Sequence, residues 1–318
     1  MQASATAQPN IALVKYWGKR DRERNLPAVS SLSITLDTLQ TMMSVRFGDC
    51  DADSLTVNGE PAPGMLTRVS YCLDLVAGSH RPRAQVDSKG NFPIGAGLAS
   101  SASAFAALAT AANAAAGTQH DRPALARFAG AVSGSAARSL YGGFVELDAG
   151  EDTIELRQLA TAADWPLAVV VAITSEGPKP VGSGDAMILS AETSPFYASW
   201  VARQPDDLVS AREAVADRDF ATLAKVAEHN CLKMHSVMWT SRPPVVYWNR
   251  ATLACMETVR SLQDDGTPVF FTIDAGPQVK AVCDPAFVDV VTSALEATPG
   301  VIRTLRSGLG DGATVVGS

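Results

Sequence analysis

The chain has 318 residues, of which 47% are hydrophobic and 19% are charged, and its formal net charge at pH 7 is −7. These proportions are typical of a globular protein in water, and a chain of this length can bury the cores of one or two domains. The acidic balance argues against nonspecific binding to nucleic acid. No apolar run reaches the ~18 residues of a membrane helix, and residues 1–9 do not have the pattern of a signal peptide. We therefore expect a cytoplasmic protein with no nucleic-acid partner and no membrane partner.

Cysteine and histidine usage argues against disulfides and metal sites. The five cysteines are odd in number and widely spaced, without a C-x-x-C pair, and the four histidines form no H-x-x-x-H pair. This usage is typical of reduced thiols in a cytoplasm. The residues are Cys50, Cys72, Cys231, Cys255, Cys283, His80, His120, His229 and His235. We expect no dedicated metal site made by the protein alone.

Strands and helices follow from the hydrophobic periodicity. Alternating or β-prone residues over 32–36, 41–47 and 54–57 predict an antiparallel series of strands, and Asn58-Gly59 marks a turn. Further strands are expected at 11–14, 144–147, 153–159, 167–173, 269–273, 279–283 and 301–305, and helices at 65–76, 105–116, 122–132, 206–216, 220–238, 247–262 and 285–297.

A cluster of cations follows the strand at 11–14. Residues 15–19 are Lys-Tyr-Trp-Gly-Lys. Two lysines beside two aromatic side chains are costly to bury unpaired, so we expect them to face a cleft. A strand end with its lysines on the surface is the alternative. The cations between residues 15 and 24 are Lys15, Lys19, Arg20, Arg22 and Arg24, which suits an anionic ligand.

A glycine-containing loop at residues 91–104 runs into the start of a helix. Gly95 and Gly97 allow positive φ and a close backbone approach, and Ser100 and Ser101 can cap the helix or bind an anion. A helix start presents unpaired N–H groups and a partial positive charge, which suit a phosphate. No Gly-Lys-Ser/Thr follows, so this is not the Walker pattern. A plain glycine loop before a buried, alanine-rich helix is the alternative.

Small residues also dominate the segment 133–143. Ser133, Ser135 and Arg138 can bind a phosphate or a carboxylate, and Arg138 can do so with two hydrogen bonds. The alternative is a helix–strand connection with capping serines. On the helix at 65–76, Arg68 is by default a surface cation, although it can reach an anion.

Two segments of the second half also suggest a site. Residues 175–185 are too rich in glycine and proline for regular structure, and we interpret them as a mobile loop that closes over a ligand, with Ser183 or Asp185 capping the next helix; a linker is the alternative. Asp274 follows the buried strand 269–273 and precedes a Gly-Pro turn, which is a plausible catalytic position. Its alternative is an Asx turn. We expect the tail at 308–312 to be flexible and not to bind a nucleotide.

Residues 93–102 resemble motif 2 of the GHMP kinase superfamily, Pro-x-x-x-Gly-Leu-x-Ser-Ser-Ala, which cradles ATP phosphates. Further stretches, in the same order, resemble the diphosphomevalonate decarboxylase family. They are residues 10–21, 26–27, 30–33, 91–93, 133–139 and 274–277. The resemblance extends over residues 9–310, which is nearly the whole chain.

This resemblance implies an α+β, two-lobed GHMP kinase-like fold with the active cleft between the lobes. It implies an N-terminal ATP-binding domain at residues 1–160 and a C-terminal α+β domain at residues 161–318. Members of the family use ATP and Mg²⁺ to phosphorylate the 3-hydroxyl of 5-diphosphomevalonate. Phosphate and CO2 then leave, and isopentenyl diphosphate forms in the mevalonate pathway of isoprenoid biosynthesis. Homodimers are typical of the family.

By position, the resemblance assigns catalysis to three residues. Asp274 would orient or deprotonate the 3-hydroxyl, Lys15 would pair with Asp274 and neutralise developing phosphate charge, and Arg138 would hold the substrate carboxylate. The residues that would bind substrate are Asn10, Tyr16, Lys19, Arg68, Ser133 and Ser135. Those that would bind ATP are Gly95, Gly97, Leu98, Ala99, Ser100, Ser101 and Ser183. Mg²⁺ would be held through the ATP phosphates, with Ser101 as a further candidate ligand.

The sequence departs from the family mainly in the 175–185 loop and just after it. Lys179 is followed by Pro180, Gly182 stands where a serine is common, and Ala186 replaces a glycine; elsewhere, Ala137 and Gln278 stand where a cysteine and an asparagine are common. These changes affect the ATP side more than the Asp–Lys–Arg set. One alternative is a phosphomevalonate decarboxylase, which uses the monophosphate. Another is a non-catalytic sensor of nucleotide and metabolite, which would not need Lys15, Arg138 and Asp274. A mevalonate 3-kinase fits less well, since its relatives lack that aspartate and lysine.

Overall fold

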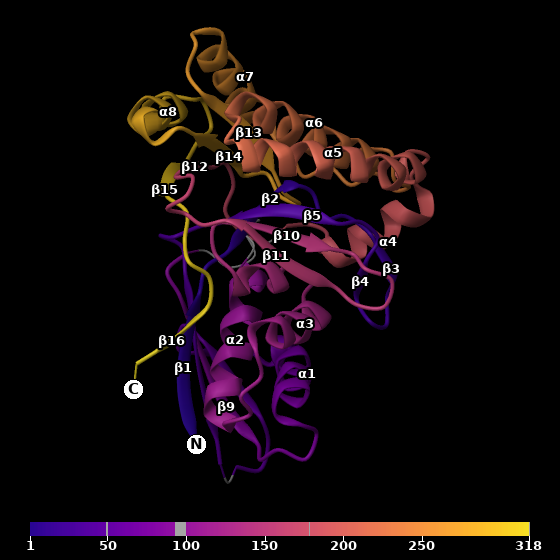
Figure 1. Cartoon of the computed structure of the whole chain (residues 1–318), viewed down its shortest axis with the longest axis vertical. Helices are drawn as coiled ribbons and strands as arrows, with labels where there is room; N and C mark the ends of the chain where they lie inside the picture. Colours follow the sequence, from indigo (N-terminus) through magenta and orange to yellow (C-terminus); the bar gives the residue numbers. More distant parts are fainter. Residues whose placement is uncertain (49, 93–99, 178, 318) are drawn as a thin grey trace.

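The computed structural model describes residues 1–48, 50–92, 100–177 and 179–317. The chain is elongated and has two lobes, with both termini in the lower lobe of Figure 1. Helices and sheets are mixed along the chain, which confirms the α+β class. Within the described ranges, no helix is both long and apolar enough to cross a membrane.

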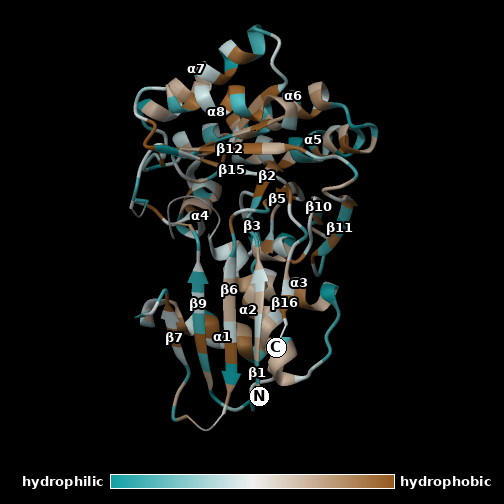
Figure 2. Cartoon of the chain, turned by 90° about the vertical axis from the view of Figure 1, so that its left-hand side faces the viewer, coloured by the Kyte–Doolittle hydropathy of each residue, from teal (hydrophilic) through white to brown (hydrophobic). Residues whose placement is uncertain are grey.

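The lower lobe is built on a six-stranded sheet with the order β16-β1-β6-β9-β7-β8. Its strands are β1 Gln2–Ala7, β6 Thr41–Phe47, β7 Ser54–Val57, β8 Glu60–Pro61, β9 Ala84–Gly90 and β16 Thr314–Val316. Burial alternates along β6 and β9, so one face of the sheet is apolar and the other is more exposed. Figure 2 shows helices α1 and α2 behind this sheet.

Three helices complete the lower lobe: α1 Leu66–Ala77, α2 Ser100–Ala116 and α3 Arg122–Val132. Alanine favours helix and carries only a methyl group, so the alanine-rich α2 packs closely against the sheet and is almost entirely buried. Asp121 caps the start of α3, because its carboxylate accepts a hydrogen bond from the Ala124 backbone N at 2.8 Å.

A second, four-stranded antiparallel sheet has the order β11-β10-β5-β2 and lies between the lower lobe and the upper helices. Its strands are β2 Asn10–Val14, β5 Ser31–Thr35, β10 Phe144–Asp148 and β11 Glu155–Ala160. The short strands β3 Lys19–Asp21 and β4 Leu26–Pro27 pair with each other, and the 3₁₀ helix η2 Ala136–Leu140 precedes β10. We call this four-stranded sheet the central sheet.

The predicted antiparallel series over residues 32–57 is wrong as a single sheet of sequential neighbours. Strand β5 is buried on both faces and joins the central sheet, whereas β6 and β7 belong to the lower lobe. Strands β6 and β7 run antiparallel to each other but are not neighbours, because β9 lies between them. Strand β9 is parallel to β7, since helix α1 connects the two and returns the chain to the same end of the sheet.

The upper lobe contains an antiparallel sheet, β13-β14-β12-β15, and five helices. The strands are β12 Ala168–Ile173, β13 Val269–Ile273, β14 Val279–Cys283 and β15 Arg303–Ser307; the helices are α4 Ser183–Thr193, α5 Tyr197–Asp217, α6 Phe220–Trp239, α7 Arg250–Asp264 and α8 Val288–Glu296. One face of this sheet packs with the central sheet, through residues such as Val169 and Phe270. The other face, with Val170 and Phe271, packs against α7 and α8.

Helix α5 is longer than the sequence predicts. It begins at Tyr197 and continues through Pro205, whereas the prediction begins at residue 206. A proline inside a helix removes one backbone hydrogen bond. Tertiary contacts outweigh that loss here, because Trp200 and Gln204, both buried, donate to backbone carbonyls of Trp17 and Lys15 at 3.1 and 2.8 Å.

The prediction of a flexible tail at residues 308–312 is wrong. Gly310 N donates to Thr35 O at 2.8 Å, and Gly143 N donates to Gly310 O at 2.8 Å. A Cβ atom built on Gly310 would lie 2.3 Å from Leu36 O, so only glycine permits this approach to β5. The tail thus returns along the central sheet, and β16 then pairs with β1 in the lower lobe.

Candidate active site

A cavity of about 600 Å³ lies between the central sheet, the starts of the lower helices and the upper lobe. Its walls include every described residue that the sequence predicts for the site. They are Asn10, Lys15, Tyr16, Lys19, Arg68, Ser100, Ser101, Ser133, Ser135, Arg138, Ser183 and Asp274. The other candidates, Gly95, Gly97, Leu98 and Ala99, lie outside the described residues.

The centre of the cleft is an ion pair between Lys15 and Asp274, which come from the ends of β2 and β13. Lys15 Nζ lies 2.8 Å from Asp274 Oδ1. The backbone of Lys15 is held by two buried side chains: its N donates to Asn230 Oδ1 at 2.8 Å, and its O accepts from Gln204 Nε2 at 2.8 Å. Burial alone would raise the pKa of Asp274, but the neighbouring ammoniums bring it below its usual range. The carboxylate is therefore ionised in the cleft.

Lys280 is a second cation at this centre, which the sequence-based predictions missed. Its Nζ lies 3.3 Å from Asp274 Oδ2, and its side chain is buried. The signal that could have found it is a lysine in a strand whose other residues, Val279, Ala281, Val282 and Cys283, are apolar. Such a lysine requires a buried counter-charge.

Helix α6 holds the strand that carries Asp274. Among the described strands, β13 lies at the edge of its sheet, and an unpaired edge leaves N–H and C=O groups without strand partners. Glu228 Oε1 accepts from Phe271 N at 3.0 Å, and Cys231 Sγ accepts from Ile273 N at 3.2 Å. His235 Nε2 lies 3.2 Å from Ile273 O, and burial lowers the pKa of His235 to about 3, so the ring is neutral. Side chains on one face of α6 thus contact the edge backbone groups of β13 immediately before Asp274.

Arg138 is a buried arginine without a carboxylate partner among the described residues. Its Nε donates to Asn10 Oδ1 at 3.1 Å, and its Nη1 donates to Ser31 Oγ at 2.7 Å. Asn10 is fixed in turn, because its Nδ2 donates to Ser139 Oγ at 2.8 Å. Burial lowers the pKa of Arg138, yet an arginine remains charged in proteins. Its net positive charge is available to an anionic ligand in the cleft.

Lys19 and Arg68 form a second positive region on the cleft wall. Arg68 Nη2 donates to Val132 O at 3.0 Å, and its guanidinium lies 4.7 Å from the centre of the Phe105 ring. Burial and the nearby Arg68 both lower the pKa of Lys19. Within the described part of the chain, neither cation has an ion-pair partner. Two adjacent cations of this kind favour a multiply charged anion.

Tyr16 lies between these regions. Its hydroxyl is buried and has no hydrogen-bond partner among the described residues, and burial raises its pKa to about 12. Gly134 permits this position, because a Cβ there would lie 2.1 Å from the hydroxyl oxygen. A buried hydroxyl of this kind is a donor available to a ligand.

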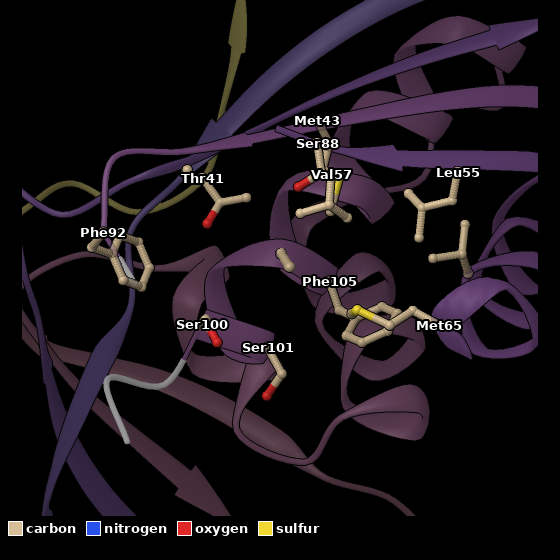
Figure 3. A pocket seen from close by; sticks show the side chains of 13 residues that line it. Thr41, Met43, Leu55, Val57, Met65, Ser88, Phe92, Ser100, Ser101 and Phe105 are labelled. Carbon is tan, nitrogen blue, oxygen red and sulfur yellow. The ribbon is translucent and has the colours of Figure 1, made fainter. Parts of the chain in front are cut away.

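A smaller, mostly apolar pocket adjoins the cleft. Met43, Leu55, Val57 and Phe105 are among the residues that line it, and it shares Ser100 and Ser101 with the cleft. Figure 3 shows Thr41, Met43 and Val57 on one side of this space and the start of α2 on the other. Ser133 Oγ donates to Ser101 Oγ at 3.4 Å, which links the start of α2 to the small-residue segment of the cleft.

The loop before α4 contacts Asp274's neighbour. Lys179 Nζ donates to Ser183 Oγ at 2.6 Å and to Ala275 O at 2.9 Å. The expected cap is wrong: Gly182 is the N-cap residue, and both Ser183 and Asp185 lie inside the first turn of α4. Gln278, noted above as unusual, accepts from Thr174 N at 2.6 Å and fixes the start of this loop. Closure of the loop over a ligand stays a prediction.

Comparisons with known proteins identify relatives over nearly the whole chain. A model of the diphosphomevalonate decarboxylase-like N-terminal domain matches residues 7–159, and a model of the mevalonate 5-diphosphate decarboxylase C-terminal domain matches residues 169–303. The diphosphomevalonate decarboxylase of Candida albicans is 33% identical over 319 residues, which cover 92% of this chain and 87% of the relative.

Solved structures agree with this result. Mevalonate diphosphate decarboxylase from Staphylococcus aureus superimposes with a TM-score of 0.93 at 35% identity. The alignment covers 99% of this chain and 98% of the Staphylococcus aureus chain. A structure described as MDDEF in complex with MVAPP, AMPPCP and magnesium has a TM-score of 0.92 at 36% identity and covers 100% of this chain and 99% of its own. The two-lobed fold and its cleft are thus those of the GHMP kinase-like class. Within that class, the chain belongs to the diphosphomevalonate decarboxylase family, as the sequence motifs predict.

Proposed function

We propose that this protein catalyses the ATP-dependent decarboxylation of 5-diphosphomevalonate to isopentenyl diphosphate, a step of isoprenoid biosynthesis. Family membership and the likeness to a structure that holds MVAPP, AMPPCP and magnesium support this function. The observation that carries it is the arrangement of Lys15, Asp274 and Arg138 in one cleft. An ionised carboxylate and an unpaired guanidinium suit a substrate that has both a hydroxyl and a carboxylate.

The first step transfers the γ-phosphoryl group of ATP to the tertiary 3-hydroxyl. Asp274 orients the hydroxyl and accepts its proton, while Lys15 neutralises charge that develops on the transferred group. The low pKa of Asp274 makes it a weak base. Orientation and electrostatic stabilisation therefore account for most of its effect, as in other phosphoryl transfers.

The second step breaks two bonds. A tertiary alcohol leaves poorly, whereas its phosphate leaves well and takes the C3–O electron pair with it. The electrons of the C–CO2 bond then form the new double bond at C3, and CO2 departs. Arg138 holds the carboxylate in line for this step, because its Asn10 and Ser31 contacts fix the guanidinium.

The remaining contacts divide between the two substrates. Lys19, Arg68 and Tyr16 bind the diphosphate of the substrate, with Ser133 and Ser135 beside them. The apolar pocket receives the purine of ATP, since it opens at Ser100 and Ser101, where the phosphates meet the positive end of α2. Ser183 contacts the γ-phosphate. Gly95, Gly97, Leu98 and Ala99 lie outside the described residues and stay predictions for the same phosphates.

Magnesium fits the oxygen donors at this place. No group of three or more histidine, cysteine, aspartate or glutamate side chains that could hold a metal occurs in the described part of the chain. Mg²⁺ retains waters and prefers phosphate oxygens, so the ATP phosphates supply most of its ligands and Ser101 offers a hydroxyl. When bound, Mg²⁺ neutralises phosphate charge.

One assay tests the function. The protein is incubated with ATP, Mg²⁺ and 5-diphosphomevalonate, and CO2 and ADP are measured in equal amounts if the proposal holds. A parallel reaction contains 5-phosphomevalonate. Absence of CO2 from both substrates would contradict a decarboxylase, and CO2 from the monophosphate alone would replace the proposed substrate by that one.

We also propose the division into domains at residues 1–160 and 161–318, with a homodimer as the assembly. The two family models end and begin at residues 159 and 169, which supports a boundary there. Strand β16, at the end of the C-terminal domain, crosses over and pairs with β1 of the N-terminal domain, so the two domains share one sheet. Light scattering of the purified protein tests the dimer, and a monomeric mass at all concentrations would contradict it.

A further inference from the structure

Lys280 is a buried cation in an apolar strand. It lies in β14 with 1% of its surface exposed. Strand alternation places it with Val282 on the face toward the central sheet, whereas Val279 and Ala281 face α7 and α8. An ammonium in this position is costly unless it is paired, and burial lowers its pKa.

Lys280 forms an ion pair with the carboxylate of Asp274. Lys280 Nζ lies 3.3 Å from Oδ2, and Lys15 Nζ lies 2.8 Å from Oδ1. The two lysines therefore approach opposite oxygens of one group. Lys15 and Asp274 line the cleft, but Lys280 is absent from the described residues that line it. It lies behind the carboxylate.

The two oxygens of Asp274 have different surroundings. Oδ2 is buried and receives no hydrogen bond of regular geometry from the described residues, although 24% of the side chain as a whole is exposed. The ion pair with Lys280 is what compensates the charge on this oxygen. Without it, the carboxylate would rotate or take up a proton, and Oδ1 would lose its orientation toward the cleft.

We propose, on the basis of the function proposed above, that Lys280 is a positioning residue for the reaction. It holds Oδ2 from behind, so that Oδ1 stays ionised and faces the 3-hydroxyl beside Lys15. Two ammoniums against one carboxylate also leave an excess of positive charge where the phosphoryl group is transferred.

Other groups near Asp274 do not replace Lys280. Arg138 and Lys179 lie on the cleft side. Cys231 and His235 lie behind the carboxylate, but burial raises the pKa of Cys231 and lowers that of His235 to about 3, so both are neutral. Lys280 is thus the cation that reaches Oδ2 from behind.

The test replaces Lys280 by methionine, which has a similar length and no charge. For Lys280→Met, kcat falls about 10- to 100-fold, as for a misplaced catalytic group, while KM for both substrates changes little. Lys280→Arg keeps the cation and recovers part of kcat. The matched control is Arg212→Met. Arg212 Nη2 lies 2.8 Å from Oε1 of Glu146, another buried carboxylate, and this ion pair is outside the cleft. Arg212→Met leaves kcat unchanged.

A double-mutant cycle separates positioning from a structural effect. If Lys280 acts through Asp274, Lys280→Met produces no further loss of kcat in the Asp274→Asn background. Equal losses in both backgrounds, or a normal kcat for Lys280→Met, would overturn the proposal. A wild-type protein that releases no CO2 would instead contradict the proposed function. In that case the same double-mutant cycle is measured as free energies of unfolding in urea. Additive changes for the two substitutions would then refute the pairing of Lys280 with Asp274.

Discussion

Two carboxylates with side chains largely enclosed by protein show how this fold separates stability from function. In the lower lobe, Asp53 receives Arg81 Nη1 on Oδ1 at 2.9 Å and Nη2 on Oδ2 at 2.7 Å, with Ser70 Oγ at 2.7 Å and Ala84 N at 2.9 Å. Among the described residues, the ion-pair partners of Asp274 are its two lysines. The exposed fraction is 6% for the Asp53 side chain and 24% for that of Asp274.

The two carboxylates differ in how many of their hydrogen-bond acceptor positions remain free for a ligand. Hydrogen bonds and the charge of Arg81 hold the pKa of Asp53 below its usual range, and no acceptor position is left for a ligand. The pKa of Asp274 is also lowered, but by point charges on flexible stems. A carboxylate held mainly by charge remains able to bind a substrate hydroxyl. We therefore infer a structural role for Asp53 and a catalytic role for Asp274.

The largest expected effect comes from Asp274→Asn. Turnover falls by about 10²- to 10⁴-fold, since the hydroxyl loses its proton acceptor, while substrate binding is largely kept. Both kcat and KM are measured below the melting temperature of the variant. A kcat within a few-fold of wild type would remove Asp274 from the mechanism and end the comparison.

Arg138→Gln applies the same comparison to two arginines. Arg81 pairs with carboxylates, whereas Arg138 has no carboxylate partner in the described part of the chain. We expect CO2 formation to fall by about 10²-fold, the cost of one lost electrostatic contact to a reacting group. Arg68→Gln is the control and raises KM for 5-diphosphomevalonate more than it lowers kcat. Full decarboxylation by Arg138→Gln would show that its charge is not used.

Asp53→Asn is expected to lower stability and to leave catalysis intact, which is the opposite of Asp274→Asn. It leaves Arg81 buried without its main counter-charge, so the free energy of unfolding falls by about 3 kcal/mol, while kcat of the folded enzyme is unchanged. Urea unfolding measures the first and steady-state kinetics the second. Asp74→Asn removes the other partner of Arg81. Asp74 Oδ1 lies 2.9 Å from Arg81 Nε, and the Asp74 side chain is 42% exposed. As a control this substitution costs at most about 1 kcal/mol.

The smallest effect is a change in the pH dependence of stability. The pKa of Asp53 is lower in the folded state than the unfolded value of about 3.9. Its contribution is therefore fully present above that value and is lost as the pH falls toward the folded pKa. Urea unfolding of wild type and Asp53→Asn in acid should show a shallower decline for the variant. Identical slopes would mean that Asp53 is not held by charge in the folded state.

Local patterns predicted most of the elements. The helix at 122–132 and the strand at 269–273 coincide with α3 and β13, because their apolar periodicity is met by burial in the fold. The strand series at 32–57 was misassigned because alternation along one strand does not reveal which sheet it joins. The tail at 308–312 was misjudged because its glycines serve close packing against β5, and sequence alone cannot distinguish that from flexibility.

The site shows the same limit. Lys15, Arg138 and Asp274 could be found because charged residues beside apolar strands or small-residue segments are locally unusual, and because the family motifs contain them. Asn230 and Gln204 were not predicted for the site, and His235 was considered only as a metal ligand, since polar residues on long helices are usually solvated. Their roles depend on which backbone groups α5 and α6 face, and this is settled only by packing.

The sequence by itself indicated most of the α+β elements, the family and several polar and charged residues of the cleft, since periodicity and motifs are properties of neighbouring residues. The tertiary structure decided which charges meet. Asp274 and Lys15 are far apart in the chain and become partners only because the ends of β13 and β2 face one cleft. Lys280 joins them because the sheet register places it beside Thr272, two residues before Asp274. Coulomb interactions depend on distance in space and on burial, neither of which a linear sequence contains.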